Sequence, residues 1–108
     1  MKITVIKQDG FVSVDGEGYS EIDLSALDSV SMLGSTVRAI QWYETFGDVE
    51  FGNSQNQVVA NFRIQDFTQF NWILEAFNLR KAEVLAEQAR IEAEILAKQT
   101  TAEPSPTV

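Results

Sequence analysis

The sequence predicts an α+β protein, in which a small antiparallel β-meander packs on a long C-terminal α-helix that extends beyond it. Two observations support this prediction. Residues 1–65 contain short runs of alternating apolar and polar side chains separated by glycine-containing turns, as half-buried strands do. From Asp66 onwards the chain has no Gly or Pro until Pro104, and its apolar residues recur with helical spacing. The period of the apolar pattern therefore changes at Asp66, from the alternation of a strand to the spacing of a helix.

The sheet domain, residues 1–65, is predicted to contain about five strands. Asp9-Gly10 lies between two β-branched runs and predicts a hairpin, because the favoured two-residue turn needs positive φ at both positions. Asp15-Gly16-Glu17-Gly18 predicts a second turn. Residues 25–36 are rich in Ser and predict a loop or a single helical turn. The strand-like runs are residues 3–7, 11–14, 19–24, 37–44 and 49–51, and residues 58–62 are a candidate for a last short strand.

The helix is predicted over residues 66–99, with residues 100–108 as a disordered tail because of their Thr- and Pro-rich composition. Asp66 and Gln69 have the spacing of a capping box. Residues 66–78 are dense in aromatic side chains, which favours packing on the sheet. A helix over residues 66–99 is about 50 Å long, whereas a globule of about 65 residues is only about 28 Å across. Residues 79–99 are therefore predicted to project or to form a coiled-coil-like contact.

An apolar stripe in the projecting part is the predicted partner-binding surface. It consists of Val84, Leu85, Ile91, Ile95 and Leu96. Two repeats describe it. An eleven-residue repeat gives a nearly straight stripe, and a heptad repeat gives a coiled-coil seam that Lys81 and Gln88 interrupt. The sequence leaves the choice between the two repeats open, and with it the number of chains that associate.

Composition argues against several classes of function. The chain has 16 acidic and 8 basic side chains, a net charge of −8, and no basic cluster, which disfavours nucleic acids and anionic membranes as partners. It contains no Cys and no His, so thiolate chemistry and the commonest general base and metal ligand are missing. We therefore predict that the protein is not an enzyme, and that it has no catalytic residue, cofactor or metal. No run is apolar enough to span a bilayer.

A carbohydrate- or metal-binding β-module is the alternative function. Trp42 and Tyr43 could stack on a sugar, although neighbours on a strand point to opposite faces, so that Trp42 is expected in the core and Tyr43 at the rim. The acidic turns, with Asp15, Glu17 and the strand-like Glu21 and Asp23, are the one cluster that could bind a hard cation. Their spacing does not match a calcium-binding loop of the EF-hand type.

The first 52 residues or so resemble a family of small tailed-bacteriophage proteins encoded beside tail or tail-fibre genes. The resemblance is carried by Ile3-Thr-Val-Ile-Lys-Gln-Asp9-Gly10, Val12-Ser-Val-Asp15-Gly16, Tyr19, Asp23-Leu24-Ser25, Ala39-Ile40-Gln41-Trp42 and Gly47-Asp-Val-Glu50-Phe51. It implies a non-enzymatic role in the virion or in tail assembly. The expected partners are other tail or tail-fibre proteins, a second copy of the chain, or both. The expected location is the virion tail, or the host cytoplasm during assembly.

Overall fold

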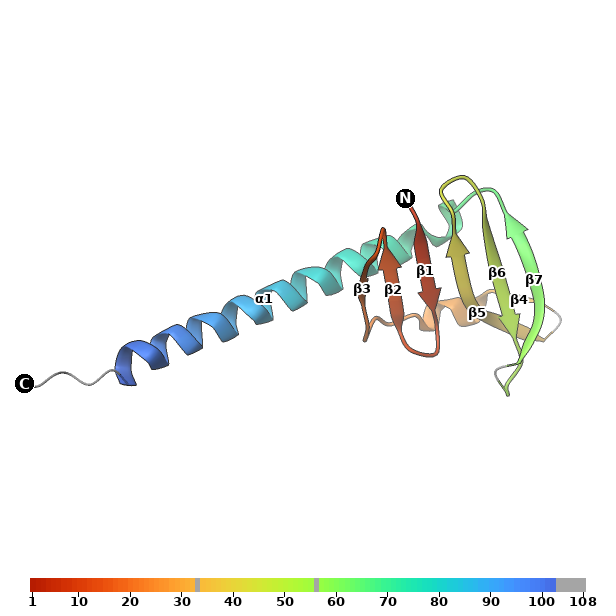
Figure 1. Ribbon diagram of the computed structural model, residues 1–108. Helices are drawn as coiled ribbons and strands as arrows, with labels where there is room; N and C mark the ends of the chain where they lie inside the picture. The colour runs from red at the N-terminus through yellow and green to blue at the C-terminus, as the bar shows by residue number, and fades with distance from the viewer. Residues whose placement is uncertain (33, 56, 103–108) are drawn as a thin grey trace, which may run out of the picture.

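The chain forms one antiparallel sheet with a single long helix leading away from it (Figure 1). The computed structural model describes residues 1–32, 34–55 and 57–102, with the side chains of residues up to Gln99. The α+β prediction is confirmed, with seven strands in place of about five. They are β1 (Ile3–Ile6), β2 (Phe11–Val14), β3 (Glu17–Tyr19), β4 (Ser31–Met32), β5 (Ser35–Trp42), β6 (Gly47–Gly52) and β7 (Val58–Ile64), followed by helix α1 (Asn71–Ala102).

The order of the strands differs from the predicted simple meander. The order is β3-β2-β1-β5-β6-β7, and β4 pairs with β5 beside this path. The chain runs outwards from β1 to the β3 edge and returns across one face through the 3₁₀ helix Ser25–Ser29. It then runs outwards again from β5 to the β7 edge. The return segment carries Leu27, which is fully buried. Residues 20–32, between β3 and β5, thus form a crossover that contains this 3₁₀ helix and β4, and the two meanders meet where β1 pairs with β5.

The turns show which glycine positions need a left-handed backbone. The two-residue turn with positive φ at both positions is Asp15-Gly16, between β2 and β3, and not Asp9-Gly10. The β1–β2 hairpin is present, but its loop spans four residues and only Gly10 has positive φ. A Cβ on Gly10 would lie 2.8 Å from the backbone oxygen of Ile22, so the site requires close backbone approach as well as positive φ. Glu21 and Asp23 fall in the crossover, outside β3.

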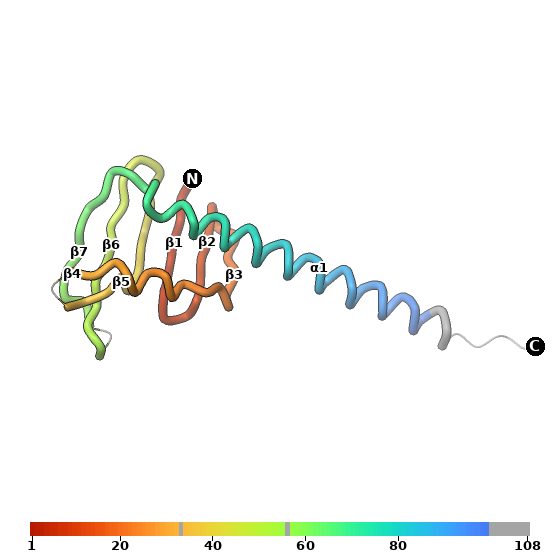
Figure 2. Tube along the Cα trace, turned by 180° about the vertical axis from the view of Figure 1, so that it is seen from behind, coloured from red at the N-terminus to blue at the C-terminus, as the bar shows by residue number. Residues whose placement is uncertain are grey.

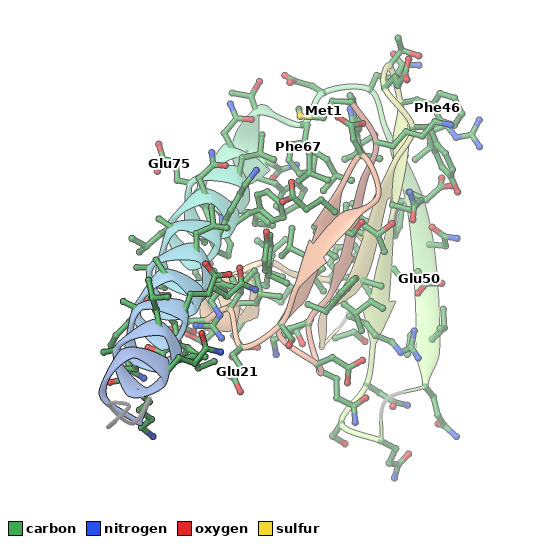
Figure 3. The ribbon with its side chains drawn as sticks, turned by 60° about the vertical axis from the view of Figure 1, so that its left-hand side comes forward. Met1, Glu21, Phe46, Glu50, Phe67 and Glu75 are labelled. Carbon is green, nitrogen blue, oxygen red and sulfur yellow. The ribbon has the colours of Figure 1, made fainter. Side chains whose placement is uncertain are left out.

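One face of the sheet carries the hydrophobic core, and the start of α1 covers it. The inward-facing residues of the central strands, Val5, Ile40 and Val49 among them, are buried. The opposite face is polar. There, Thr4 donates to Gln41 at 2.6 Å and Arg38 pairs with Glu50 at 3.0 Å. This alternation is what a sheet with one solvated face requires. Figure 3 shows Phe67 between helix and sheet, and Glu50 on the far side of the sheet.

The helix begins later than predicted. Asp66 Oδ1 accepts hydrogen bonds from the backbone N–H of Thr68 at 2.9 Å and from its hydroxyl at 2.5 Å. This turn leads into a 3₁₀ turn, Thr68–Phe70, and α1 starts at Asn71. The predicted capping box of Asp66 and Gln69 is therefore wrong, because Thr68 offers Asp66 two donors closer along the chain.

The far part of α1 extends well beyond the sheet (Figures 1 and 2). The molecule measures 76 × 30 × 17 Å along its principal axes. The helix continues to Ala102, so it includes three residues that were predicted to belong to the tail. The rest of the predicted disordered tail, residues 103–108, lies outside the described residues. We call residues 1–78 the head and residues 79–102 the projecting segment.

Candidate interaction surface on the projecting segment

The first three turns of α1 belong to the core of the head. Ile73 is fully buried and Phe77 nearly so. The rings of Phe77 and Tyr19, at the β3 edge, have their centroids 5.4 Å apart. Trp72, Leu74 and Ala76 pack partly against the same core, whereas Glu75 points away from the sheet (Figure 3). The aromatic density of residues 66–78 therefore has the structural role that the sequence predicted.

Two basic residues bind the helix to the β3 edge just before it leaves the head. Arg80 Nε donates to the backbone oxygen of Ser20 at 3.0 Å, and its Nη2 pairs with Glu21 at 3.0 Å. Lys81 Nζ pairs with Glu17 at 3.0 Å. Glu21 lies at the side of the sheet that faces the helix in Figure 3. We call Arg80, Lys81, Glu17 and Glu21 the clamp. It joins the helix to the β3 edge at the point where the projecting segment leaves the head.

Within the clamp, the contact between Glu17 and Lys81 shifts the pKa values of both side chains. The pKa of Glu17 is lowered by the hydrogen bond that its carboxylate accepts from the Tyr19 hydroxyl and by the bond from Lys81. The pKa of Lys81 is raised by its bond to Glu17. Each group thus favours its charged form in the folded protein. Because these side chains are exposed to water, the ion pair contributes little to overall stability.

The predicted stripe leaves the core soon after the clamp. Val84 is half-buried, and every residue from Leu85 to Gln99 is exposed. Leu85 is 50% exposed, Ile91 42%, Ile95 49% and Leu96 64%. Leu79 is also exposed, on another side of the helix. An exposed apolar stripe along about three turns is more than the scattered surface hydrophobics of an ordinary soluble protein. The five predicted residues do lie together along the projecting helix.

The charges on the projecting segment are balanced. Arg90 bonds to Glu87 at 2.5 Å and to Glu94 at 2.6 Å, three residues before it and four after. Its hydrogen bonds lower the pKa of Glu87. Such pairs support an exposed helix but supply no tertiary packing. The segment contains four acidic residues and four basic ones: Glu83, Glu87, Glu92, Glu94, Arg80, Lys81, Arg90 and Lys98.

The residues of the alternative β-module have other roles. Trp42 is 7% exposed and packs on Phe67, with ring centroids 5.5 Å apart, while Tyr43 is exposed at the rim. Trp42 therefore presents no face for a sugar. Asp15 accepts a hydrogen bond from the backbone of Lys2 at 2.8 Å, and Asp23 accepts one from Ser25 at 3.0 Å. Within the described part of the chain, no three carboxylates are grouped as a metal site.

A second apolar surface was not predicted from the sequence. Val58, Val59 and Phe62 on the edge strand β7 are about half-exposed. Phe62 pairs across the sheet with Val49 and touches the ring of Phe51 edge-on, so it lies on the core face. It is exposed because α1 covers the other side of that face, towards β2 and β3. No local pattern in the sequence indicates which side of the face the helix covers.

Comparison of the chain with models of protein families, with curated proteins and with solved structures finds no match. In the described residues, no helix has the length and apolarity needed to cross a membrane.

Proposed function

We propose that this protein is a non-enzymatic component of a bacteriophage tail, or an assembly protein for tail fibres, and that it acts by protein–protein association along the projecting segment. The observation that carries the association is the exposure of Leu85, Ile91 and Ile95 on a helix whose preceding turns are buried in the head. Residues 85–99 have no tertiary packing in the described structure, and tertiary packing supplies most of the stability of helices in proteins. Burial against another protein would stabilise this part of the helix.

The phage setting is supported by the resemblance of residues 1–52 to small tail-associated proteins. A head with a projecting helix suits a connecting role, because the head and the helix can contact different neighbours. The proposed location is the virion tail for a structural component, and the host cytoplasm during assembly for a protein that leaves the finished particle. The proposed partners are tail or tail-fibre proteins, a second copy of the chain, or both.

The test uses a matched pair of variants in a phage genome that encodes this chain. The stripe variant carries Leu85→Glu and Ile95→Glu. The control carries Ala86→Glu and Ala97→Glu, which add the same charge on exposed positions away from Val84, Ile91 and Ile95. We expect the stripe variant to lower the yield of tailed, infectious particles at least tenfold and the control to leave it near wild type. Equal yields from both variants would contradict the proposal.

Mass spectrometry of the purified particles separates the two roles. A structural component is present in wild-type virions and missing from those of the stripe variant. An assembly protein is missing from both, although the stripe variant still assembles poorly. A chain bound equally to particles of the stripe variant and of the control shows that the head, and not the stripe, makes the contact.

A further inference from the structure

The exposed stripe continues the face of α1 that packs on the sheet. Three adjacent apolar pairs occur at intervals of eleven residues: Ile73-Leu74, Val84-Leu85 and Ile95-Leu96. Eleven residues make about three helical turns, so the pairs lie almost in line. The first pair is packed in the head, with Ile73 fully buried. The second and third repeat the same chemistry on the projecting segment, where Leu85 and Ile95 are half-exposed.

The two exposed pairs are matched to each other in an antiparallel arrangement. They are about 16 Å apart along the helix axis. A second helix running in the opposite direction, with the two-fold axis between Ala89 and Arg90, places Val84 of each chain level with Ile95 of the other, and Leu85 within about 3 Å of Leu96 along the axis. Gln88 and Ile91 then meet at the centre. A contact of this kind is isologous, since the same patch is used by both chains.

Charge favours this direction over a parallel one. The head carries eleven acidic and four basic side chains, a net charge of −7, while the projecting segment is neutral. A parallel pair would bring two strongly negative heads side by side. The antiparallel pair separates the ends of the heads by about 35 Å, at about 1.5 Å per residue. This distance is several times the Debye length of about 8 Å at physiological ionic strength.

The centre of the antiparallel contact carries little unbalanced charge. Arg90 lies beside the two-fold axis and already bonds to Glu87 and Glu94 of its own chain. The interruption of the heptad seam at Lys81 also has no consequence there, because Lys81 is bound to Glu17 of the head. The paired surface therefore starts after the clamp and consists of Val84 and the residues beyond it.

We propose that the stripe binds a second copy of this chain, and that the two projecting segments pair antiparallel with the heads at opposite ends. This inference rests on the proposed function, because it names the partner of the same surface. The dimer would be a rod with one head at each end, so that it holds two identical heads apart. A partner helix from another protein is the competing occupant, and a parallel dimer is the competing geometry.

The test measures distances between spin labels in the full-length protein. The chain has no Cys, so Ala82→Cys and Ala89→Cys each give a single labelling site. Ala82 is far from the proposed two-fold axis, and Ala89 is beside it. In the antiparallel dimer the Ala82 labels are offset by about 22 Å along the axis. The Ala89 labels are close in either direction of pairing and serve as the control for association.

We expect strong short-range coupling between Ala89 labels and a distance above about 20 Å between Ala82 labels, both abolished by Leu85→Glu with Ile95→Glu. Short-range coupling at both sites would show a parallel pair and overturn the inference, while leaving stripe-mediated assembly in place. No coupling at either site at about 0.5 mM protein would show a monomer and also overturn it. Particle assembly by the stripe variant then decides separately whether the proposed function stands.

Discussion

The two halves of α1 have similar composition along one face but opposite environments. In the first half, Ile73 and Phe77 are buried against the sheet, and in the second half, Ile91 and Ile95 face solvent. The apolar pairs of the eleven-residue repeat, Ile73-Leu74, Val84-Leu85 and Ile95-Leu96, occur in both halves. The apolar pattern alone therefore does not say whether a helical face is covered. What differs is the reach of the sheet, which ends at β3, where the clamp binds the helix.

This difference divides the helix into a part that the head stabilises and a part that it does not. The first part gains from burial of large apolar side chains, each contributing roughly 1.5–3 kcal/mol. The second part has only helix propensity and surface ion pairs such as those of Arg90, which are screened by water and contribute little. Substitutions at equivalent positions in the two parts should therefore have unequal effects.

The largest difference in the free energy of unfolding is expected between Ile73→Ala and Ile95→Ala. The two positions are two eleven-residue repeats apart. Ile73 is fully buried, so its truncation should lower the free energy of unfolding by about 2–5 kcal/mol. Ile95→Ala should change it by about 0.5 kcal/mol or less at protein concentrations where the chain is monomeric. Urea unfolding followed by the fluorescence of Trp42 and Trp72 measures both. Equal losses would mean that the far half of α1 packs on the head.

The next largest difference is expected between two proline substitutions, one on each side of the clamp. Pro inside a helix costs about 3 kcal/mol, because it removes a hydrogen bond and clashes with the preceding turn. Ala76 packs partly against the core, so Ala76→Pro should unfold the head. Ala93→Pro should reduce helical circular dichroism while the thermal midpoint of the head stays within a degree or two. A large drop in the thermal midpoint of the head for Ala93→Pro would show that the two parts of α1 unfold as one cooperative unit.

The smallest effect is expected at the clamp. The pKa of Glu17 is lowered from its ordinary value of 4.5 by Tyr19 and Lys81. The Glu17 carboxylate therefore stabilises the folded protein above pH 4.5, its ordinary pKa. This stabilisation is lost as the pH falls through the lower pKa of the folded state. The Glu17→Gln variant should lack this part of the acid dependence, so its thermal midpoint should approach that of wild type as the pH falls below the lowered pKa of Glu17. Parallel pH profiles for the two proteins would show that the Glu17 contact contributes nothing.

The same comparison shows what the sequence could predict. Local patterns were sufficient for the hairpins, for the burial of Trp42 and for the stripe, because each depends on neighbours within a few residues. The crossover between β3 and β5 was not predictable, since it depends on the pairing of β1 with β5. The clamp joins residues 59 to 64 positions apart. Lys81 was interpreted only as an interruption of the heptad, and Glu17 as a candidate cation ligand.

Native-state hydrogen exchange along α1, at two protein concentrations, measures whether the projecting segment depends on a partner for its stability. At low concentration, amides of residues 73–81 should be protected through the head, and those of residues 84–99 should exchange quickly, because an exposed helix opens easily. At high concentration, protection should rise in residues 84–99 and stay unchanged in residues 73–81. Protection of residues 84–99 that equals that of residues 73–81 and does not depend on concentration would contradict the division of α1 into these two parts.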